Sequence, residues 1–140
     1  MIVGILKEIK AEENRVSMTP AGVEVMVQHG HAILVEKRAG IGSGFEDEAY
    51  VKAGAEVVST GEEIFRRSDM VMHVKEPLPP EYDLIREDQI VFTYLHLAAA
   101  EELHMGSRRY SCSADNVHRH GHGVHLGNRV VAGKQRIRVS

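Results

Sequence analysis

Four side chains in the sequence could together bind and react with a small carboxylic acid: Arg15, Lys75, Tyr94 and His96. Arginine and lysine hold a carboxylate through charge-assisted hydrogen bonds, and a nearby histidine can take up or release a proton. Taken singly, each has an ordinary alternative, because the two cations could be solvated surface charges and the two rings could belong to the core. Their function therefore depends on whether the fold brings them together.

Alternating apolar runs and short amphipathic segments predict an α/β fold. The expected strands are residues 2–6, 32–36, 55–58, 69–74 and 89–94, and the expected helices are 20–29, 47–52, 62–67 and 82–86. Thr19 and Thr60 are expected to cap helices, and Gly30 and Gly54 to end them. Apolar strands separated by helices predict a parallel, Rossmann-like sheet of about five strands flanked by helices, with right-handed crossovers.

The loops that follow three of these strands contain the four candidate residues. A polar loop leading to Arg15 follows the first strand, Lys75 follows the fourth, and the 94–96 segment follows the fifth. Parallel sheets bind ligands beyond the carboxyl ends of their strands, so we predict that the four side chains line one crevice. The obvious counter-ions there are Glu12, Glu13 and Glu76.

A glycine-rich stretch at residues 40–44 lies between a strand and a helix, where phosphate-binding loops occur. It lacks the spacing of a dinucleotide fingerprint, because Phe45 stands where the third glycine is needed. No acidic residue ends a second strand at the expected distance. We interpret this stretch as a structural turn and expect no cofactor-binding residues in the chain.

The charge of the 140-residue chain divides it sharply. Residues 1–104 carry a net charge of −9 and residues 105–140 a net charge of +6, which the overall value of −3 conceals. We therefore predict a folded domain over 1–104 and a divergent, basic, His-rich tail over 105–140 that is irregular and disordered. The sequence has neither a membrane-length apolar run nor a secretory signal, so we expect a cytoplasmic protein without a membrane partner.

The tail admits two other interpretations, a metal site and a nucleic-acid surface. Four histidines between residues 118 and 125 could bind a transition metal, and the positive charge could attract nucleic acid. Only Cys112 and Asp115 could complete a ligand set, and Tyr110 is the only aromatic residue of the tail that could stack on a base. We predict neither a metal site nor a nucleic-acid partner.

Several motifs resemble the opening of bacterial alanine dehydrogenases. They are MIVGILKEIK at the start, ENRV at 13–16 with TPAGV at 19–23, GSGF at 42–45, VKEPLP at 74–79 and FTYLHLAA at 92–99. The resemblance covers residues 1–103, about three quarters of the chain. The proton-translocating nicotinamide nucleotide transhydrogenases share the opening but usually lack the last two motifs, so the alanine dehydrogenases are favoured.

The resemblance implies the N-terminal, substrate-domain portion of an enzyme that converts L-alanine, NAD and water into pyruvate, ammonia and NADH. Carried over residue by residue, Arg15 and Lys75 hold the substrate carboxylate, Tyr94 lines the pocket, and His96 is the general acid/base, with Lys75 also in the catalytic set. The family's NAD domain and its catalytic aspartate have no counterpart in this sequence. We therefore expect this chain alone to bind no NAD and to be inactive.

Two rival functions and two further expectations follow from the sequence. The chain could instead be a fragment of a transhydrogenase alpha subunit, or a non-catalytic module that binds small carboxylates or a partner.

The resemblance stops where the charge changes sign, and a reading-frame change near codon 104 would explain both. The family's later helices cover the sheet, so without them an apolar face should be exposed and promote self-association.

Overall fold

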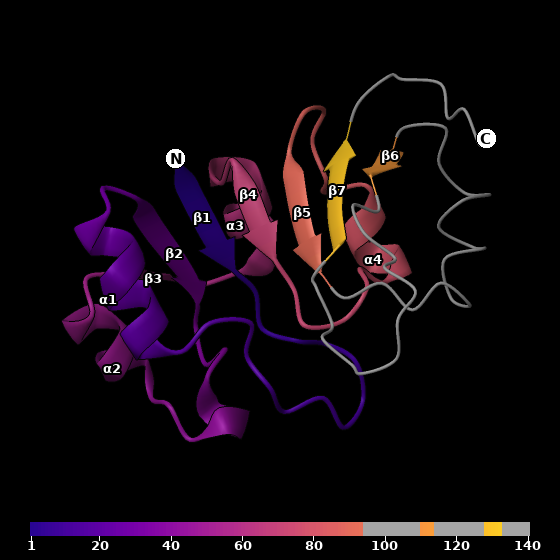
Figure 1. The fold of residues 1–140 in the computed structure, drawn as a ribbon. Coiled ribbons are helices and arrows are strands. Elements are labelled where there is room, and N and C mark those ends of the chain that lie inside the picture. The colour runs from indigo at the N-terminus through magenta and orange to yellow at the C-terminus, as the bar shows by residue number, and fades with distance from the viewer. Residues whose placement is uncertain (94–109, 114–127, 133–140) are drawn as a thin grey trace, which may run out of the picture.

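The computed structural model describes residues 1–93, 110–113 and 128–132. The strands there are β1 (Ile2–Ile5), β2 (Ala32–Glu36), β3 (Glu56–Val58), β4 (Met70–Met72), β5 (Ile90–Thr93), β6 (Tyr110–Ser113) and β7 (Asn128–Ala132). The helices are α1 (Pro20–Gln28), the 3-10 helix η1 (Ile41–Ser43), α2 (Asp47–Lys52), α3 (Gly61–Arg67) and α4 (Pro79–Tyr82). One sheet with the order β3-β2-β1-β4-β5-β7-β6 joins the strands (Figure 1).

The strands β1 to β5 form the parallel part of the sheet. β1 lies between β2 and β4, and Val3 is opposite Ile33 on one side and Met70 on the other. β3 and β5 extend this arrangement outward, again in parallel. The predicted α/β class with a parallel sheet of five strands is therefore confirmed.

Helices cover both faces of this sheet and create two apolar clusters. On one face, Val23 of α1 and Tyr50 of α2 pack with alternate residues of β1 and β2 such as Val3. On the other face, Ile64 and Phe65 of α3 pack with the remaining alternate residues of the strands. Burial on both faces explains why these strands have nearly continuous apolar sequences.

The helix boundaries follow the predicted capping signals. The Thr19 hydroxyl accepts a hydrogen bond from the Gly22 N–H at the start of α1, and the Thr60 hydroxyl accepts one from the Glu63 N–H of α3. Gly30 and Gly54 have positive φ angles of 82° and 93°, as glycines that terminate helices commonly do. Among the described residues, no helix has the length and apolar character needed to span a membrane.

The helix predicted at 82–86 begins earlier, at Pro79, so its predicted boundaries were wrong. Proline is favoured at the first position of a helix, because its missing N–H would have no partner there. The Glu81 carboxylate accepts a hydrogen bond from the Leu78 N–H at 2.8 Å and completes the N-terminus. The proline-rich stretch thus starts the helix, which shares only Tyr82 with the predicted range.

Two strands beyond residue 104 extend the sheet, whereas the sequence predicted only irregular structure there. β7 pairs antiparallel with β5, and β6 pairs antiparallel with β7. A strand at the edge of a sheet presents unpaired N–H and C=O groups, and the β-branched Val130 and Val131 favour pairing with it. Most of the 105–140 segment lies outside the described residues, and its disorder stays a prediction.

Gly4 permits the close approach of α3 to β1. A Cβ at Gly4 would clash with the Ile64 Cγ2 and the Ser68 Oγ, so Gly4→Ala should destabilise the fold by about 1–3 kcal/mol. Gly22→Ala is the control, because the Cβ there would meet the flexible Met18 side chain and would favour helix α1. Urea unfolding measures both, and a Gly4→Ala protein as stable as the control would contradict this packing.

Candidate functional site

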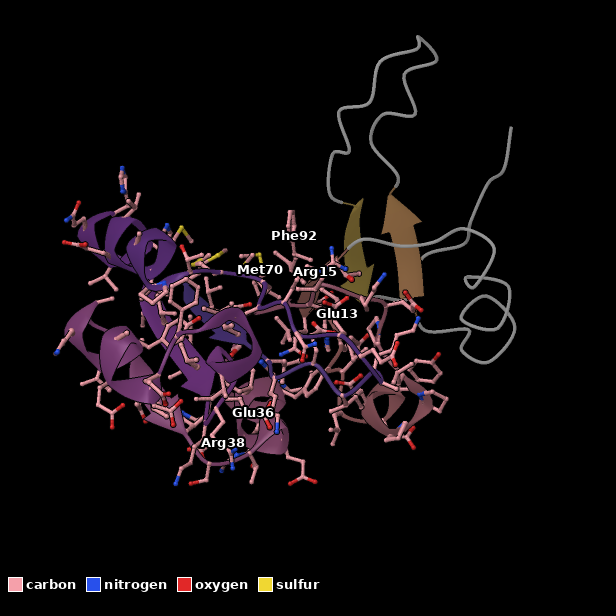
Figure 2. All side chains as sticks on the ribbon, turned by 90° about the horizontal axis from the view of Figure 1, so that it is seen from below. Glu13, Arg15, Glu36, Arg38, Met70 and Phe92 are labelled. Atoms are coloured by element: carbon pink, nitrogen blue, oxygen red, sulfur yellow. The ribbon has the colours of Figure 1, made fainter. Side chains whose placement is uncertain are left out.

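The carboxyl ends of the parallel strands bring Arg15 and Lys75 to the same edge of the sheet. β1 runs into the loop that carries Arg15, and β4 runs directly into the segment that carries Lys75. Figure 2 looks onto this edge. The other two predicted site residues, Tyr94 and His96, lie outside the described residues, so their positions relative to this pair stay predictions.

Arg15 forms a bidentate ion pair with Glu13. The Nε donates to Glu13 Oε1 at 2.8 Å, and Nη2 donates to Glu13 Oε2 at 2.6 Å (Figure 2 shows the two side chains together). The Arg15 backbone N–H adds a third hydrogen bond to Oε1 at 3.0 Å. The side chain of Arg15 is 66% exposed while that of Glu13 is 7% exposed, so the guanidinium is accessible from solvent.

The charge of Lys75 acts on the same carboxylate. The Arg15 hydrogen bonds and charge, together with the charge of Lys75, lower the pKa of Glu13 from 4.5 to about 2, against an opposing effect of burial. Arg15 therefore contacts this carboxylate directly, and the charge of Lys75 adds a smaller effect without a hydrogen bond or ion pair to it among the described contacts. An arrangement of this kind can bind a small anionic ligand.

Hydrogen bonds on both sides of Lys75 hold its backbone in place. The Val74 N–H donates to Glu8 Oε1 at 2.6 Å, and the buried Thr93 hydroxyl donates to the Lys75 carbonyl oxygen at 2.6 Å. The next residue, Glu76, forms an ion pair with Lys10 at 2.6 Å. Side chains from the β1 loop and from β5 thus fix the position from which Lys75 extends.

A buried histidine, which the sequence interpretation missed, lies beneath this edge. His73 is 3% exposed, and its Nδ1 lies 3.5 Å from Glu8 Oε1 while its Nε2 lies 3.5 Å from Glu81 Oε1. Both carboxylates also accept backbone hydrogen bonds, from Val74 and from Leu78. The cluster therefore ties β1, β4 and α4 together. Its sequence signal was weak, since nothing in the apolar strand-like stretch around His73 indicates that two distant glutamates face it.

Two hollows meet at Arg15. One, of about 200 Å³, is polar and is lined by Lys7, Glu8, Glu13, Asn14, Arg15, Arg38, Ala39, Ile41 and Gly42. The other, of about 230 Å³, has a more apolar wall and is lined by Arg15, Val16, Ser17, Met72, His73, Val74 and Phe92. A ligand whose carboxylate is held by Arg15 could place a short apolar group in the second hollow.

A second carboxylate at this edge, that of Glu36, has the opposite electrostatic environment. Burial raises the pKa of Glu36, although the Lys7 N–H donates a hydrogen bond of 2.9 Å to its Oε2. Figure 2 shows Glu36 near Arg38 and apart from the Glu13–Arg15 pair. The pKa of Glu13 is lowered because cations lie near it, whereas the pKa of Glu36 is raised because burial dominates.

The glycine-rich stretch at residues 40–44 packs against the protein itself. A Cβ at Gly40 would lie 2.7 Å from the Tyr50 ring, and one at Gly42 would lie 2.7 Å from the Asn14 carbonyl oxygen. Gly44 ends η1 with a φ of 83°. Packing and backbone conformation account for these glycines, in agreement with the interpretation as a structural turn.

No metal-binding cluster of three or more His, Cys, Asp or Glu side chains occurs in residues 1–93 or in the two described strands that follow. The histidines between residues 118 and 125, which we weighed as possible ligands, lie outside the described residues.

A family profile shows to which family the chain belongs. The profile described as "Alanine dehydrogenase/PNT, N-terminal domain" matches residues 4–116. The chain belongs to this family. The alanine dehydrogenase of Methanococcus maripaludis is 53% identical over 103 residues, and that of Bacillus subtilis is 54% identical over 103 residues. Each match covers 74% of this chain but only 28% and 27%, respectively, of the relative, so the chain spans little more than a quarter of their length.

Solved structures of the family agree with this assignment. A structure named L-alanine dehydrogenase superposes with a TM-score of 0.71 at 53% identity, covering 74% of this chain and 28% of that one. A transhydrogenase from Sinorhizobium meliloti superposes with a TM-score of 0.68 at 30% identity, covering 73% of this chain and 30% of that one. The described alanine dehydrogenase/PNT domain thus has the fold of its relatives, and the transhydrogenase is the more distant of these two.

The first prediction from this site concerns the pKa of Glu13. Because its pKa in the folded protein is about 2 against an ordinary 4.5, its ionised form contributes stability that is fully present above pH 4.5 and is lost as the pH falls toward 2. Arg15→Ala should raise the pKa of Glu13 toward 4.5, as measured by NMR titration of its carboxyl carbon. Arg66→Ala, an exposed arginine on α3, is the control, and an unchanged pKa in Arg15→Ala would contradict the assigned cause.

A second prediction concerns the hydrogen bond between Thr93 and Lys75. Thr93→Val leaves the Lys75 carbonyl without this donor and should lower the free energy of unfolding by about 1–3 kcal/mol. Ser17→Ala removes a longer bond, 3.3 Å, to the Met72 carbonyl and should have a smaller effect. Equal losses for the two variants in urea unfolding would show that the Lys75 backbone is not specially held.

Proposed function

We propose that this chain is the substrate-carboxylate-binding portion of an NAD-dependent L-alanine dehydrogenase. The observation that carries the proposal is the exposed Arg15 guanidinium, which already holds a carboxylate at the carboxyl edge of the sheet to which β4 also brings Lys75. The identities of 53% and 54% to alanine dehydrogenases support the choice of substrate class, which is L-alanine or pyruvate.

The chemistry expected of each residue follows from its charge and position. Arg15 offers a planar pair of N–H donors that matches a carboxylate, and Lys75 adds a second positive charge from a segment with a fixed backbone. The apolar hollow beside Arg15 suits the methyl group of a three-carbon acid. The resemblance supplies the remaining roles in the proposal, with His96 as the general acid/base, Lys75 beside it in the catalytic set and Tyr94 as pocket wall.

NAD is the cofactor of the proposed whole enzyme, but the glycine-rich stretch at residues 40–44 does not fit it. The glycines at 40–44 meet Tyr50 and Asn14 where a phosphate-binding loop would need open space. Hydride transfer requires the nicotinamide to be held against the substrate, and we propose that this chain alone does not supply that positioning. We therefore propose that the isolated chain binds substrate weakly and does not turn it over.

Two alternatives compete with this proposal. A fragment of a transhydrogenase alpha subunit is less well supported, because the transhydrogenase structure is 30% identical to the chain and the alanine dehydrogenase structure 53%. A module that binds small carboxylates without catalysis would use the same two cations. Activity assays with an added NAD domain of an alanine dehydrogenase separate the two, because only the enzyme portion should then convert pyruvate.

The proposal includes a cytoplasmic location and self-association of the chain. Met70 and Phe92 are half-buried on the face of the sheet that α1 covers, but they lie beyond that helix (Figure 2). These partly exposed apolar side chains are the surface through which we propose that copies of the chain associate. Light scattering of the purified chain tests this part, and a monodisperse monomer would contradict the expected association.

Pyruvate titration by calorimetry tests the anchoring residues. Arg15→Ala and Lys75→Ala should each weaken pyruvate binding by about tenfold or more, because each loses a charge-assisted contact worth roughly 1.5–3 kcal/mol. Arg66→Ala and Lys52→Ala, which remove the same charges on helices α3 and α2, are matched controls and should bind as the wild type does. Equal binding by all five proteins would refute the site.

An NADH-linked assay with pyruvate and ammonium tests the expected lack of turnover. The isolated chain should give no activity above background. Turnover that is abolished by His96→Ala would contradict the proposal that a further domain is needed.

A further inference from the structure

The Glu13 carboxylate contacts Arg15 in the way that a substrate carboxylate would. Its two oxygens accept hydrogen bonds from Nε at 2.8 Å and from Nη2 at 2.6 Å, which is the fork-to-fork geometry of arginine–carboxylate recognition. The Lys75 charge also stabilises this carboxylate. Glu13 therefore makes with Arg15 the contact that the proposed function assigns to the substrate.

The backbone of the loop is shaped to present Glu13 in this place. Glu12 has a φ of 63°, a left-handed conformation that is unfavourable for a non-glycine residue. The Glu13 N–H donates to the Lys10 carbonyl at 3.2 Å and closes a tight turn around Glu12. Strained backbone of this kind persists where the surrounding structure imposes it, and it occurs often at ligand sites.

We propose that Glu13 is an internal stand-in for the substrate carboxylate, which occupies Arg15 in the ligand-free protein and is displaced when substrate binds. This inference rests on the proposed function of Arg15. Glu13 thereby lowers the affinity of the site for small monocarboxylates and keeps the guanidinium oriented before the ligand arrives.

Displacement is energetically feasible because the pair is partly solvated. The Arg15 side chain is 66% exposed, so solvent screens the guanidinium side of the pair even though the Glu13 side chain is only 7% exposed. The incoming carboxylate replaces the same hydrogen bonds, so the net change is small. After displacement the negative charge of Glu13 remains next to the ligand and disfavours it through Coulomb repulsion.

Removing the Glu13 charge should therefore strengthen anion binding. Glu13→Gln keeps the shape of the side chain, and it should bind pyruvate about three- to tenfold more tightly than the wild type, the range expected from a lost exposed ion pair and one nearby like charge. Glu12→Gln is the matched control, since it removes the same charge from the adjacent residue of the loop. It should change the affinity less than about twofold.

Calorimetric titration of pyruvate into wild type, Glu13→Gln, Glu12→Gln and Arg15→Ala separates the two proposals. Tighter binding by Glu13→Gln alone, with loss of binding by Arg15→Ala, supports both. Unchanged or weaker binding by Glu13→Gln, or an equal gain in Glu12→Gln, overturns the stand-in while the role of Arg15 stands. Absence of pyruvate binding in both wild type and Glu13→Gln, or full binding by Arg15→Ala, overturns the proposed function and the stand-in together. Urea unfolding of each variant confirms that it is folded.

A direct readout of displacement is the titration of Glu13 itself. Without ligand, the Arg15 contact holds the pKa of Glu13 at about 2. With saturating pyruvate, a displaced Glu13 loses these hydrogen bonds and gains a negative neighbour, so its pKa should rise toward or above 4.5 as followed by NMR of its carboxyl carbon. A pKa that stays near 2 under saturation would show that the pair remains intact and would overturn the inference.

Discussion

Parallel pairing of β1 with both β2 and β4 is the constraint on which the rest of the structure depends. Because these strands run in one direction, the segments that follow them must emerge at the same edge of the sheet. Arg15 and Lys75 are 60 positions apart in the sequence, yet one carboxylate experiences both charges. The close packing of α3 on Gly4 keeps β1 at the centre of this arrangement, so the core and the site share one geometric cause.

A buried polar cluster connects that core to the site. Glu8 is within 3.5 Å of His73 and also accepts the Val74 N–H, so the same side chain lies against a buried ring and fixes the segment that precedes Lys75. The Nε2 of that ring has no hydrogen-bond partner among the described residues, and its nearest carboxylate oxygen, from Glu81, lies 3.5 Å away. The segment that carries Lys75 is thereby positioned by side chains from other parts of the chain.

The sequence was sufficient for the parts of the structure that local chemistry determines. Periodicity and capping residues located the five parallel strands and helices α1, α2 and α3, and strand direction then placed Arg15 and Lys75 at the same edge of the sheet. Two local signals in the sequence were not used in the prediction, namely the start of α4 at Pro79 with the Glu81 carboxylate and the contact of Glu13 with Arg15 two residues later. The placement of Glu8 and Glu81 around His73 does not follow from spacing, because Glu8 is distant from His73 in the sequence. The positions of Tyr94 and His96 stay predictions.

The central place of β1 also has a consequence for how the chain folds. The Ile2 N–H donates to an Asp69 side-chain oxygen across 67 positions of sequence, and β1 cannot complete its pairing until β4 is available. Contacts between residues far apart in sequence slow folding, because a long loop must close before they form. During synthesis the edge of β1 that later pairs with β4 therefore remains without its partner strand. A chaperone or a second nascent chain could pair with that edge.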